Sequence, residues 1–339
     1  MFGMIKAMRG LGVEVDLFAP PDWLPGRSPF RRLLPALGTM ASVIVRLRRY
    51  DALYVRAHPV AWPVAVLARL LNVPVIQEVN GKTQDILITH GRLAFLGRIV
   101  AFFQHSQYRN ADFLAAVTPG IADWLAGLSP RGTIVTNPNG VDTGFFTPQA
   151  VPLPESSGGG PYAIMVSSFS RWHGIETLLK AVKKSDWPQE LRVLLIGDGP
   201  ERERLAGDIR AAGRIEWIGT VPFEQLPGYL AGAAMNLVLI ESPQGRSDAG
   251  VAPLKLYEAM SSACPVIATD QPYQRGIVED ASAGIVIPAG DPSALSAAAA
   301  RLFSDPELRM ASGEAGRRFV LRGHDWKNRA ATILKLLQL

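Results

Sequence analysis

The chain has 339 residues, enough for two domains that each bury a core of their own. Hydrophobic residues make up 48% and charged residues 19%, as in globular proteins, and no apolar run reaches the roughly 18 residues of a membrane-spanning helix. The net charge of +5 is modest, and without a zinc finger, an RNP motif or a Lys/Arg-rich tract we do not expect nucleic acid as a partner.

The first half of the chain alternates short β-branched segments with helical ones, which is typical of a parallel sheet with crossover helices. The predicted strands are Val13–Phe18, Ala52–Val55, Val73–Val79, Phe113–Val117 and Thr133–Thr136. Residues 1–12 are predicted to be a helix, and further helices separate the strands, among them Val60–Leu71 and Leu93–Tyr108. This half therefore predicts one α/β domain, over residues 1–146.

A segment rich in proline, glycine and serine, residues 147–161, predicts an interdomain linker. The alternation then restarts over residues 162–323, which predicts a second α/β domain. Its predicted strands are Tyr162–Val166, Val193–Ile196, Ile215–Ile218, Asn236–Ile240, Val266–Ala268 and Gly284–Ile287. Asp291 and Asp305 each precede a proline, the pattern of a capped helix start. Residues 324–339 follow as a final amphipathic helix.

Sheets of this kind bind ligands beyond the carboxyl ends of their strands. The helix that begins near Pro253 follows a glycine-containing loop, so its free N–H groups and its dipole favour an anion. Lys255 adds a cation, and Glu258, three residues later, can accept hydrogen bonds from ribose hydroxyls. The alternative is an ordinary strand–loop–helix unit with a surface Lys–Glu pair.

Two further loops of the second half are candidates for ligand contact. In residues 167–174, Arg171 and His173 can reach phosphate oxygens, although an exposed arginine and a packed histidine explain them equally well. Residues 197–200 form a tight turn. They do not form a dinucleotide fingerprint, because Arg202 stands where a third glycine is needed. In the first half, residues 78–81 and 137–142 end strands, and we expect their loops to line an opposite wall.

The sequence shows no metal site. No Asp-x-Asp pair is present, and the five histidines lack ligand spacing. Cys264 lies among small apolar residues, so a packing thiol is the better interpretation.

Together these segments resemble the retaining glycosyltransferases of the GT-B fold, of the group 1 or family 4 type, over nearly the whole chain. The resemblance lies in residues 116–119, 137–143, 196–201, 218–222, 253–260 and 264–270. It implies two Rossmann-like parallel-sheet domains facing a cleft, with the last helix crossing back to the first domain. It also implies a nucleoside-diphosphate sugar as co-substrate, without a metal or other cofactor.

The resemblance assigns roles position by position. Glu258 would hold the donor ribose, and Val221 would lie by the nucleobase. The remaining donor-binding positions are Lys255, His173 and the backbone amides of Gly250, Val251 and Ala252. The usual Arg/Lys clamp on the diphosphate falls on Ser168 and His173, which leaves Arg171 as the substitute catalytic cation. The histidine of the family's first domain falls near Asn80, the second catalytic candidate.

The resemblance predicts a metal-independent hexosyltransferase that acts on a cell-envelope glycan, a lipid carrier or a small acceptor. One alternative is a GT-B nucleotide-sugar epimerase. Another is a degenerate binding subunit, because Gly250 replaces a frequent glutamate and Ser168 replaces a residue of the usual Arg/Lys clamp. In addition, residues 1–12 fit the first helix, so the first strand and its glycine loop are missing. A NAD dehydrogenase is disfavoured, since no Gly-x-Gly-x-x-Gly follows a strand.

We expect a cytoplasmic protein, because the single cysteine forms no internal disulfide and residues 1–12 lack a signal-peptide pattern. Peripheral contact with the inner face of the membrane is a separate hypothesis. The basic run 46–49 and the helical segment 92–109, which includes Phe95, Phe102 and Phe103, would rest on an anionic interface. Helices that turn apolar faces to the core and basic faces to solvent are the alternative.

Overall fold

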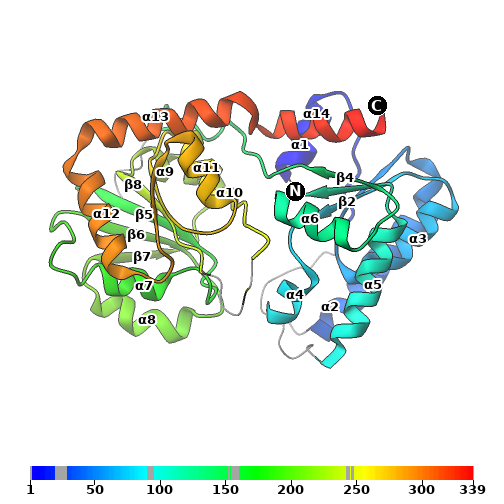
Figure 1. Ribbon diagram of the computed structural model, residues 1–339, viewed down its shortest axis with the longest axis horizontal. Helices are drawn as coiled ribbons and strands as arrows, with labels where there is room; N and C mark the ends of the chain where they lie inside the picture. The colour runs from blue at the N-terminus through cyan, green and yellow to red at the C-terminus, as the bar shows by residue number, and fades with distance from the viewer. Residues whose placement is uncertain are drawn as a thin grey trace. The chain divides into compact units, whose positions relative to one another are not determined.

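The computed structural model describes residues 2–19, 29–89, 95–151, 153, 160–241, 245 and 248–338. These form two compact α/β units (Figure 1). The first unit comprises residues 1–138, 244–251 and 327–339, and the second comprises residues 139–243 and 252–326. Seven of the residues that the sequence assigned to a linker, 152 and 154–159, lie outside the described part.

The first unit contains a four-stranded parallel sheet in the order β1-β2-β3-β4. The strands are β1 (Leu53–Arg56), β2 (Val75–Val79), β3 (Phe113–Ala116) and β4 (Thr133–Thr136). The helices are α1 (Phe2–Gly10), α2 (Pro29–Arg46), α3 (Trp62–Leu70), α4 (Thr83–Thr89), α5 (Gly97–Asn110), α6 (Pro119–Gly127) and α14 (Trp326–Leu337). Four of the five strands predicted for this half are confirmed.

The predicted strand Val13–Phe18 is wrong, because this described segment forms no ladder with any strand. Its end packs instead against the short 3-10 helix that follows α2. The Tyr50 hydroxyl donates to Asp16 at 2.7 Å, and the rings of Phe18 and Tyr50 meet edge to face at 5.9 Å. Alternating apolar residues favour an extended backbone, but a strand also needs a partner at the sheet edge.

Two apolar clusters hold the first unit together. One joins the sheet to α5 and α6 through Tyr108, Leu114 and Leu125. The other joins α2 and α3 to the edge of the sheet near β2 and includes Leu47 and Val64. The final helix, α14, contributes most of its residues to this unit and buries Ala330, Ile333 and Leu334. In the described part of the chain, no helix is both long and apolar enough to cross a membrane.

The second unit contains a six-stranded parallel sheet in the order β10-β9-β8-β5-β6-β7. The strands are β5 (Tyr162–Ser167), β6 (Arg192–Gly197), β7 (Ile215–Gly219), β8 (Met235–Val238), β9 (Val266–Thr269) and β10 (Gly284–Ile287). All six strands predicted for this half are confirmed. The order reverses between β5 and β8, as in dinucleotide-binding folds, and the crevice at such a reversal is the usual ligand site.

Helices cover both faces of this sheet (Figure 1). They are α7 (Ile175–Ala181), α8 (Arg202–Ala211), α9 (Leu226–Ala231), α10 (Leu254–Ser261), α11 (Gln274–Ala281), α12 (Pro292–Ser304) and α13 (Pro306–Gly323). Along β5, Ala163 and Met165 point to the face that carries α7, α8 and α12, whereas Tyr162 and Ile164 point to the face that carries α10, α11 and α13. Burial on both faces explains the near-continuous apolar strands.

Both predicted helix caps are present. The Asp291 carboxylate accepts hydrogen bonds from the N–H groups of Ser293 and Ala294, at 2.9 and 3.0 Å, and Asp305 accepts one from Leu308 at 2.9 Å. These two caps fix the starts of α12 and α13, the long helices that complete the second unit.

Candidate functional site

The carboxyl ends of β5 and β8 are tied together by their loops. The Glu241 N–H donates to the Trp172 carbonyl at 2.8 Å, and the Thr177 hydroxyl donates to Glu241 Oε1 at 2.6 Å. Gly174 adopts φ +58°, and a Cβ there would lie 2.7 Å from Leu239 Cβ. Only glycine fits this position, which fixes the start of α7 against the loop after β8.

Lys255 lies at this reversal of strand order. Its half-buried side chain donates from Nζ to the carbonyl of Val166, near the end of β5, at 3.3 Å. Burial lowers the pKa of the ammonium to about 8, although the nearby Glu258 carboxylate opposes that shift. A cation is therefore held at the strand end with little solvent around it, where its attraction for an anion is strong.

Glu258 lies one turn later on the same helix and is also half-buried. Burial raises the pKa of its carboxyl to about 7, against the lowering effect of Lys255. Within the described chain no hydrogen bond to this carboxylate is found, so both oxygens are available to a ligand. An acceptor of this kind suits hydroxyl groups.

His173 lies at the same strand end. Its Nδ1 is within hydrogen-bonding distance of the Ser167 and Ser168 hydroxyls, at 3.2 and 3.3 Å. Because Ser167 follows Val166, the partner of Lys255, the structure brings His173 and Lys255 to one strand end. The sequence predicted both residues, but it did not predict the serine pair that holds the ring.

The start of α10 provides a second source of positive potential. Pro253 occupies the N-cap with extended backbone, and no side chain caps this end. The first amides of the helix and its dipole are therefore not neutralised by a side chain. Lys255 lies in the first turn of this helix, where the sequence predicted an anion site.

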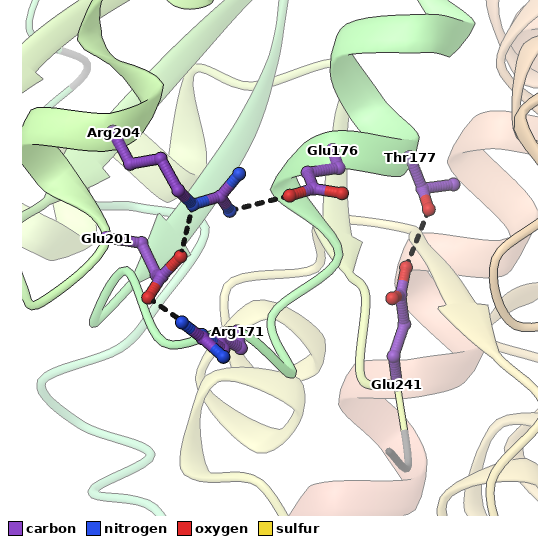
Figure 2. Close-up of polar contacts among 6 residues, drawn as sticks. All are labelled: Arg171, Glu176, Thr177, Glu201, Arg204 and Glu241. Carbon is purple, nitrogen blue, oxygen red and sulfur yellow. Dashed lines mark hydrogen bonds and ion pairs between the residues drawn. The ribbon is translucent and has the colours of Figure 1, made fainter.

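Arg171 belongs to a different group of charges (Figure 2). Its Nε donates to Glu201 Oε1 at 3.1 Å, and the other Glu201 oxygen accepts from Arg204 at 2.5 Å. Arg204 also pairs with Glu176 at 2.6 Å. Burial alone would raise the pKa of Glu201, but hydrogen bonds from the two arginines outweigh burial and lower it.

This charge network, defined as Arg171, Glu176, Glu201 and Arg204, lines a cavity of about 400 Å³. Figure 2 shows Arg171 and Arg204 converging on Glu201, with Glu241 turned toward Thr177. The sequence interpretation missed Glu201 and Glu176. The three-residue spacing of Glu201 and Arg204 was a readable signal, whereas Glu176 joins them only because α7 and α8 begin side by side.

The tight turn of residues 197–200 has a steric role. A Cβ on Gly197 would lie 1.8 Å from the Ser167 carbonyl oxygen, and one on Gly199 would lie 1.9 Å from that of Ser168. Gly197 also adopts φ +123°. The two glycines therefore let the β6 loop pack directly beneath the serines that hold His173.

The other predicted donor residues are spread along the chain. Val221 follows β7 and is half-buried against the core. Gly250 (φ +91°) and Val251 belong to the first unit, in which the Thr118 hydroxyl donates to the adjacent Ala249 carbonyl at 2.7 Å. Ala252 belongs to the second unit, and its carbonyl accepts from Asn139 at 2.7 Å.

Asn80, the catalytic candidate of the first unit, follows β2 and is exposed. Its amide donates to Glu78 Oε1 at 2.6 Å, and the Tyr54 hydroxyl donates to Glu78 Oε2 at 2.5 Å. Burial and the neighbouring Glu78 charge hold the pKa of Tyr54 well above its usual value. Tyr54 of β1 and the end of β2 thus form a polar cluster that can bind hydroxyl groups.

Neither a metal site nor a reactive thiol appears in the part of the chain that the structure describes. No group of three or more His, Cys, Asp or Glu residues could hold a metal ion there. Cys264 is buried in the apolar core, and burial raises the pKa of its thiol.

Two family profiles match this chain. Residues 153–319 match "Glycosyl transferases group 1", and residues 2–140 match "Glycosyl transferase 4-like domain". The curated relatives include a GDP-mannose-dependent α-(1-6)-phosphatidylinositol monomannoside mannosyltransferase from Mycolicibacterium smegmatis, 27% identical over 68% of this chain. The lipopolysaccharide core biosynthesis glycosyltransferase LpsE from Rhizobium meliloti is 25% identical over 62% of it. The matches span 60% and 59% of those two proteins.

Solved structures show the same fold. Sucrose-phosphate synthase from Thermosynechococcus elongatus superimposes with a TM-score of 0.74 at 19% identity, over 96% of this chain and 84% of that one. Anabaena HepE in complex with UDP-glucose gives 0.72 at 16% identity, over 98% and 88%. With two parallel-sheet α/β units of the GT-B type and a family profile on each half, the chain belongs to the group 1 glycosyltransferase family.

Proposed function

We propose that this protein is a retaining hexosyltransferase that uses a nucleoside-diphosphate sugar as donor. The observation that carries the proposal is the half-buried Lys255–Glu258 pair beside the uncapped start of α10, at the reversal of strand order. Family membership supports the reaction class, and the mannosyl- and N-acetylglucosaminyltransferases among the relatives support a hexose.

The proposed donor site assigns one task to each group. Lys255 and the α10 amides stabilise the negative charge that develops on the departing diphosphate. Glu258 accepts hydrogen bonds from the ribose hydroxyls, since no hydrogen bond to its carboxylate is found in the described chain. His173, held by Ser167 and Ser168, contacts a phosphate oxygen. The amides of Gly250, Val251 and Ala252 and the side chain of Val221 remain predicted contacts to the diphosphate and the base.

Arg171 remains a proposed second cation of the site. Its guanidinium uses Nε for Glu201, which leaves the terminal nitrogens as donors, and 79% of the side chain is exposed. An arginine that Glu201 holds at its inner edge presents its outer edge to a ligand in a fixed direction. The role of Arg171 would be secondary to that of Lys255, because exposure weakens its attraction for an anion.

The acceptor is proposed to bind the first unit at Asn80. Asn80, Glu78 and Tyr54 present amide, carboxylate and phenol groups that can orient a sugar or cyclitol hydroxyl. The relatives act on phosphatidylinositol mannosides, lipopolysaccharide core and an aminocyclitol, which supports a glycan, a lipid-linked glycan or a small polyol as acceptor.

We further propose that catalysis needs no metal ion. Lys255 and the α10 dipole provide the positive charge that Mg²⁺ provides elsewhere for a diphosphate leaving group. Transfer should therefore persist in excess EDTA, and a requirement for added Mg²⁺ or Mn²⁺ would refute this part of the proposal.

The test is a donor panel with product analysis. The purified chain is incubated with UDP-, GDP- and ADP-hexoses, with and without glycan and polyol acceptors, and products are identified by mass spectrometry and by NMR of the anomeric proton. A transferred hexose with donor configuration supports the proposal. An epimerised donor without transfer identifies an isomerase. Binding of no donor by a folded protein supports the degenerate binding subunit that Gly250 and Ser168 suggest.

A further inference from the structure

Helix α5 (Gly97–Asn110) carries polar residues on its buried side and large apolar residues on its solvent side. Its buried side carries Gln104, Gln107 and Tyr108, each 2% exposed or less. Its solvent side carries Ile99 and Phe102, 53% and 65% exposed, and Phe95 just before the helix is 82% exposed. A helix packed on a sheet normally turns its apolar residues inward, so the exposed set needs another explanation.

The exposed residues form one stripe. Phe95, Ile99 and Phe102 follow the spacing of residues that share one face of a helix. The Phe102 ring meets Phe103 edge to face at 5.6 Å, and Phe103 meets Trp62 at 5.2 Å. Phe102 of the stripe therefore packs against aromatic side chains that join α5 to α3.

The buried glutamines of α5 are paired through their amide nitrogens. Gln104 donates to the Tyr108 hydroxyl at 2.6 Å, and Gln107 donates to the His58 carbonyl at 2.5 Å. These bonds offset part of the cost of burying the two amide groups, whereas the Oε1 atoms of Gln104 and Gln107 are buried without a hydrogen-bond partner in the described chain. The two hydrogen bonds hold this polar side of the helix inward, with the apolar stripe on the solvent side.

The charges around the stripe are positive. Arg98 and Arg109 are exposed on the same helix, and residues 92–110 contain no aspartate or glutamate. The basic excess of the chain lies in this part of the sequence: residues 1–138 hold 15 Lys and Arg against 8 Asp and Glu, whereas residues 139–339 hold 20 against 22.

We propose that the α5 stripe docks the protein onto an anionic lipid surface. The aromatic and aliphatic side chains enter the boundary between headgroups and acyl chains, and the two arginines contact lipid phosphates. A second copy of the chain is a poorer occupant, because a two-fold contact would bring arginines together with no carboxylate on the helix to pair them. The inference does not depend on the proposed roles of Lys255 and Glu258, which lie in the other unit.

The test is co-sedimentation of the full chain with vesicles of phosphatidylcholine, with and without phosphatidylglycerol, at low and high salt. We expect binding to the anionic vesicles that weakens at high salt. The triple variant F95S/I99S/F102S should bind the anionic vesicles at least about tenfold more weakly than the wild type. The variant R98Q/R109Q should lose about fivefold per arginine at low salt and little at high salt.

The matched control replaces two exposed apolar residues of α13, Met310 and Leu321, in the variant M310S/L321S. It should bind vesicles like the wild type. Thermal unfolding and donor binding of every variant show whether the fold and the second unit remain intact. The proposal is overturned if the wild type ignores anionic vesicles, if the control loses as much binding as the triple variant, or if the stripe variants instead abolish a dimer in sedimentation equilibrium.

Discussion

Two groups of charges occupy the carboxyl edge of the second sheet, and burial acts on them in opposite ways. In the charge network, hydrogen bonds from Arg171 and Arg204 overcome the burial of Glu201, and its carboxyl stays ionised. In the Lys255–Glu258 pair, burial dominates and moves each group toward its neutral form. The comparison supports the proposal that Lys255 and Glu258, whose charges are less satisfied than those of the network, belong to the donor site.

Within the Lys255–Glu258 pair, the two pKa shifts change the stability of the fold with pH in opposite directions. The pKa of Lys255 is lowered from 10.5 to about 8, so the unfolded chain binds more protons between these values and stability rises with pH there. The pKa of Glu258 is raised from 4.5 to about 7, so the folded chain binds more protons in that window and stability falls as the pH rises. Near neutral pH both shifts oppose folding, as expected of groups kept for function.

The largest effect is expected from the cation. Lys255→Met should lower kcat/KM for sugar transfer about 10²- to 10³-fold, with kcat affected, because it removes positive charge that acts on the leaving diphosphate. Steady-state kinetics with the donor identified by the panel measure this. Lys180→Met, the same change at an exposed position of α7, is the control. Equal activities of both variants would remove Lys255 from the site.

A smaller loss is expected from the ribose contact. Glu258→Gln should weaken the donor about 10- to 100-fold, because hydrogen bonds to a charged acceptor are replaced by neutral ones. The loss should shrink when the donor is a 2′,3′-dideoxy analogue, which has no ribose hydroxyls to bind. Glu279→Gln on the surface of α11 serves as the comparison. An undiminished loss with the dideoxy donor would contradict the assignment.

The pH profile tests the pair as a unit. Both groups carry their charges between the Glu258 pKa of about 7 and the Lys255 pKa of about 8. A plot of kcat/KM against pH should therefore be a narrow bell, and kcat/KM should fall about tenfold per pH unit on each side. The acid limb should move in Glu258→Gln. A flat profile from pH 6 to 9 would show that these protonation states do not matter.

The smallest effects are expected in the charge network, and they should appear in stability. Glu201→Gln should lower the free energy of unfolding by about 1 kcal/mol, a modest value because Arg171 and Arg204 are largely exposed. Its kcat/KM should stay within about threefold, since Arg171 is a secondary cation. Urea titration and kinetics measure the two, with Glu203→Gln on the same helix as reference. A loss of kcat/KM well beyond threefold, in a variant that remains folded, would place the charge network in the catalytic site.

The sequence predicted the second unit better than the first. Helices cover both faces of its sheet, so continuous apolar runs predicted all six strands from β5 to β10. Asp291 and Asp305, each before a proline, predicted the starts of α12 and α13. In the first unit, Val13–Phe18 shows that alternation alone does not make a strand, because pairing depends on a tertiary neighbour. At the site, the spacing of Lys255 and Glu258 was readable, whereas the meeting of Glu176, Glu201 and Arg171 needed the positions of two helices.

The glycine turn between β6 and α8 has a consequence for engineering. Because Gly197 and Gly199 pack against the carbonyls of Ser167 and Ser168, the turn lies directly against the main chain of the serines that hold His173. A side chain introduced at either position would displace that main chain and, with it, the proposed phosphate contact of His173. Libraries aimed at new donor sugars should leave this turn untouched and diversify the residues whose side chains reach the ligand.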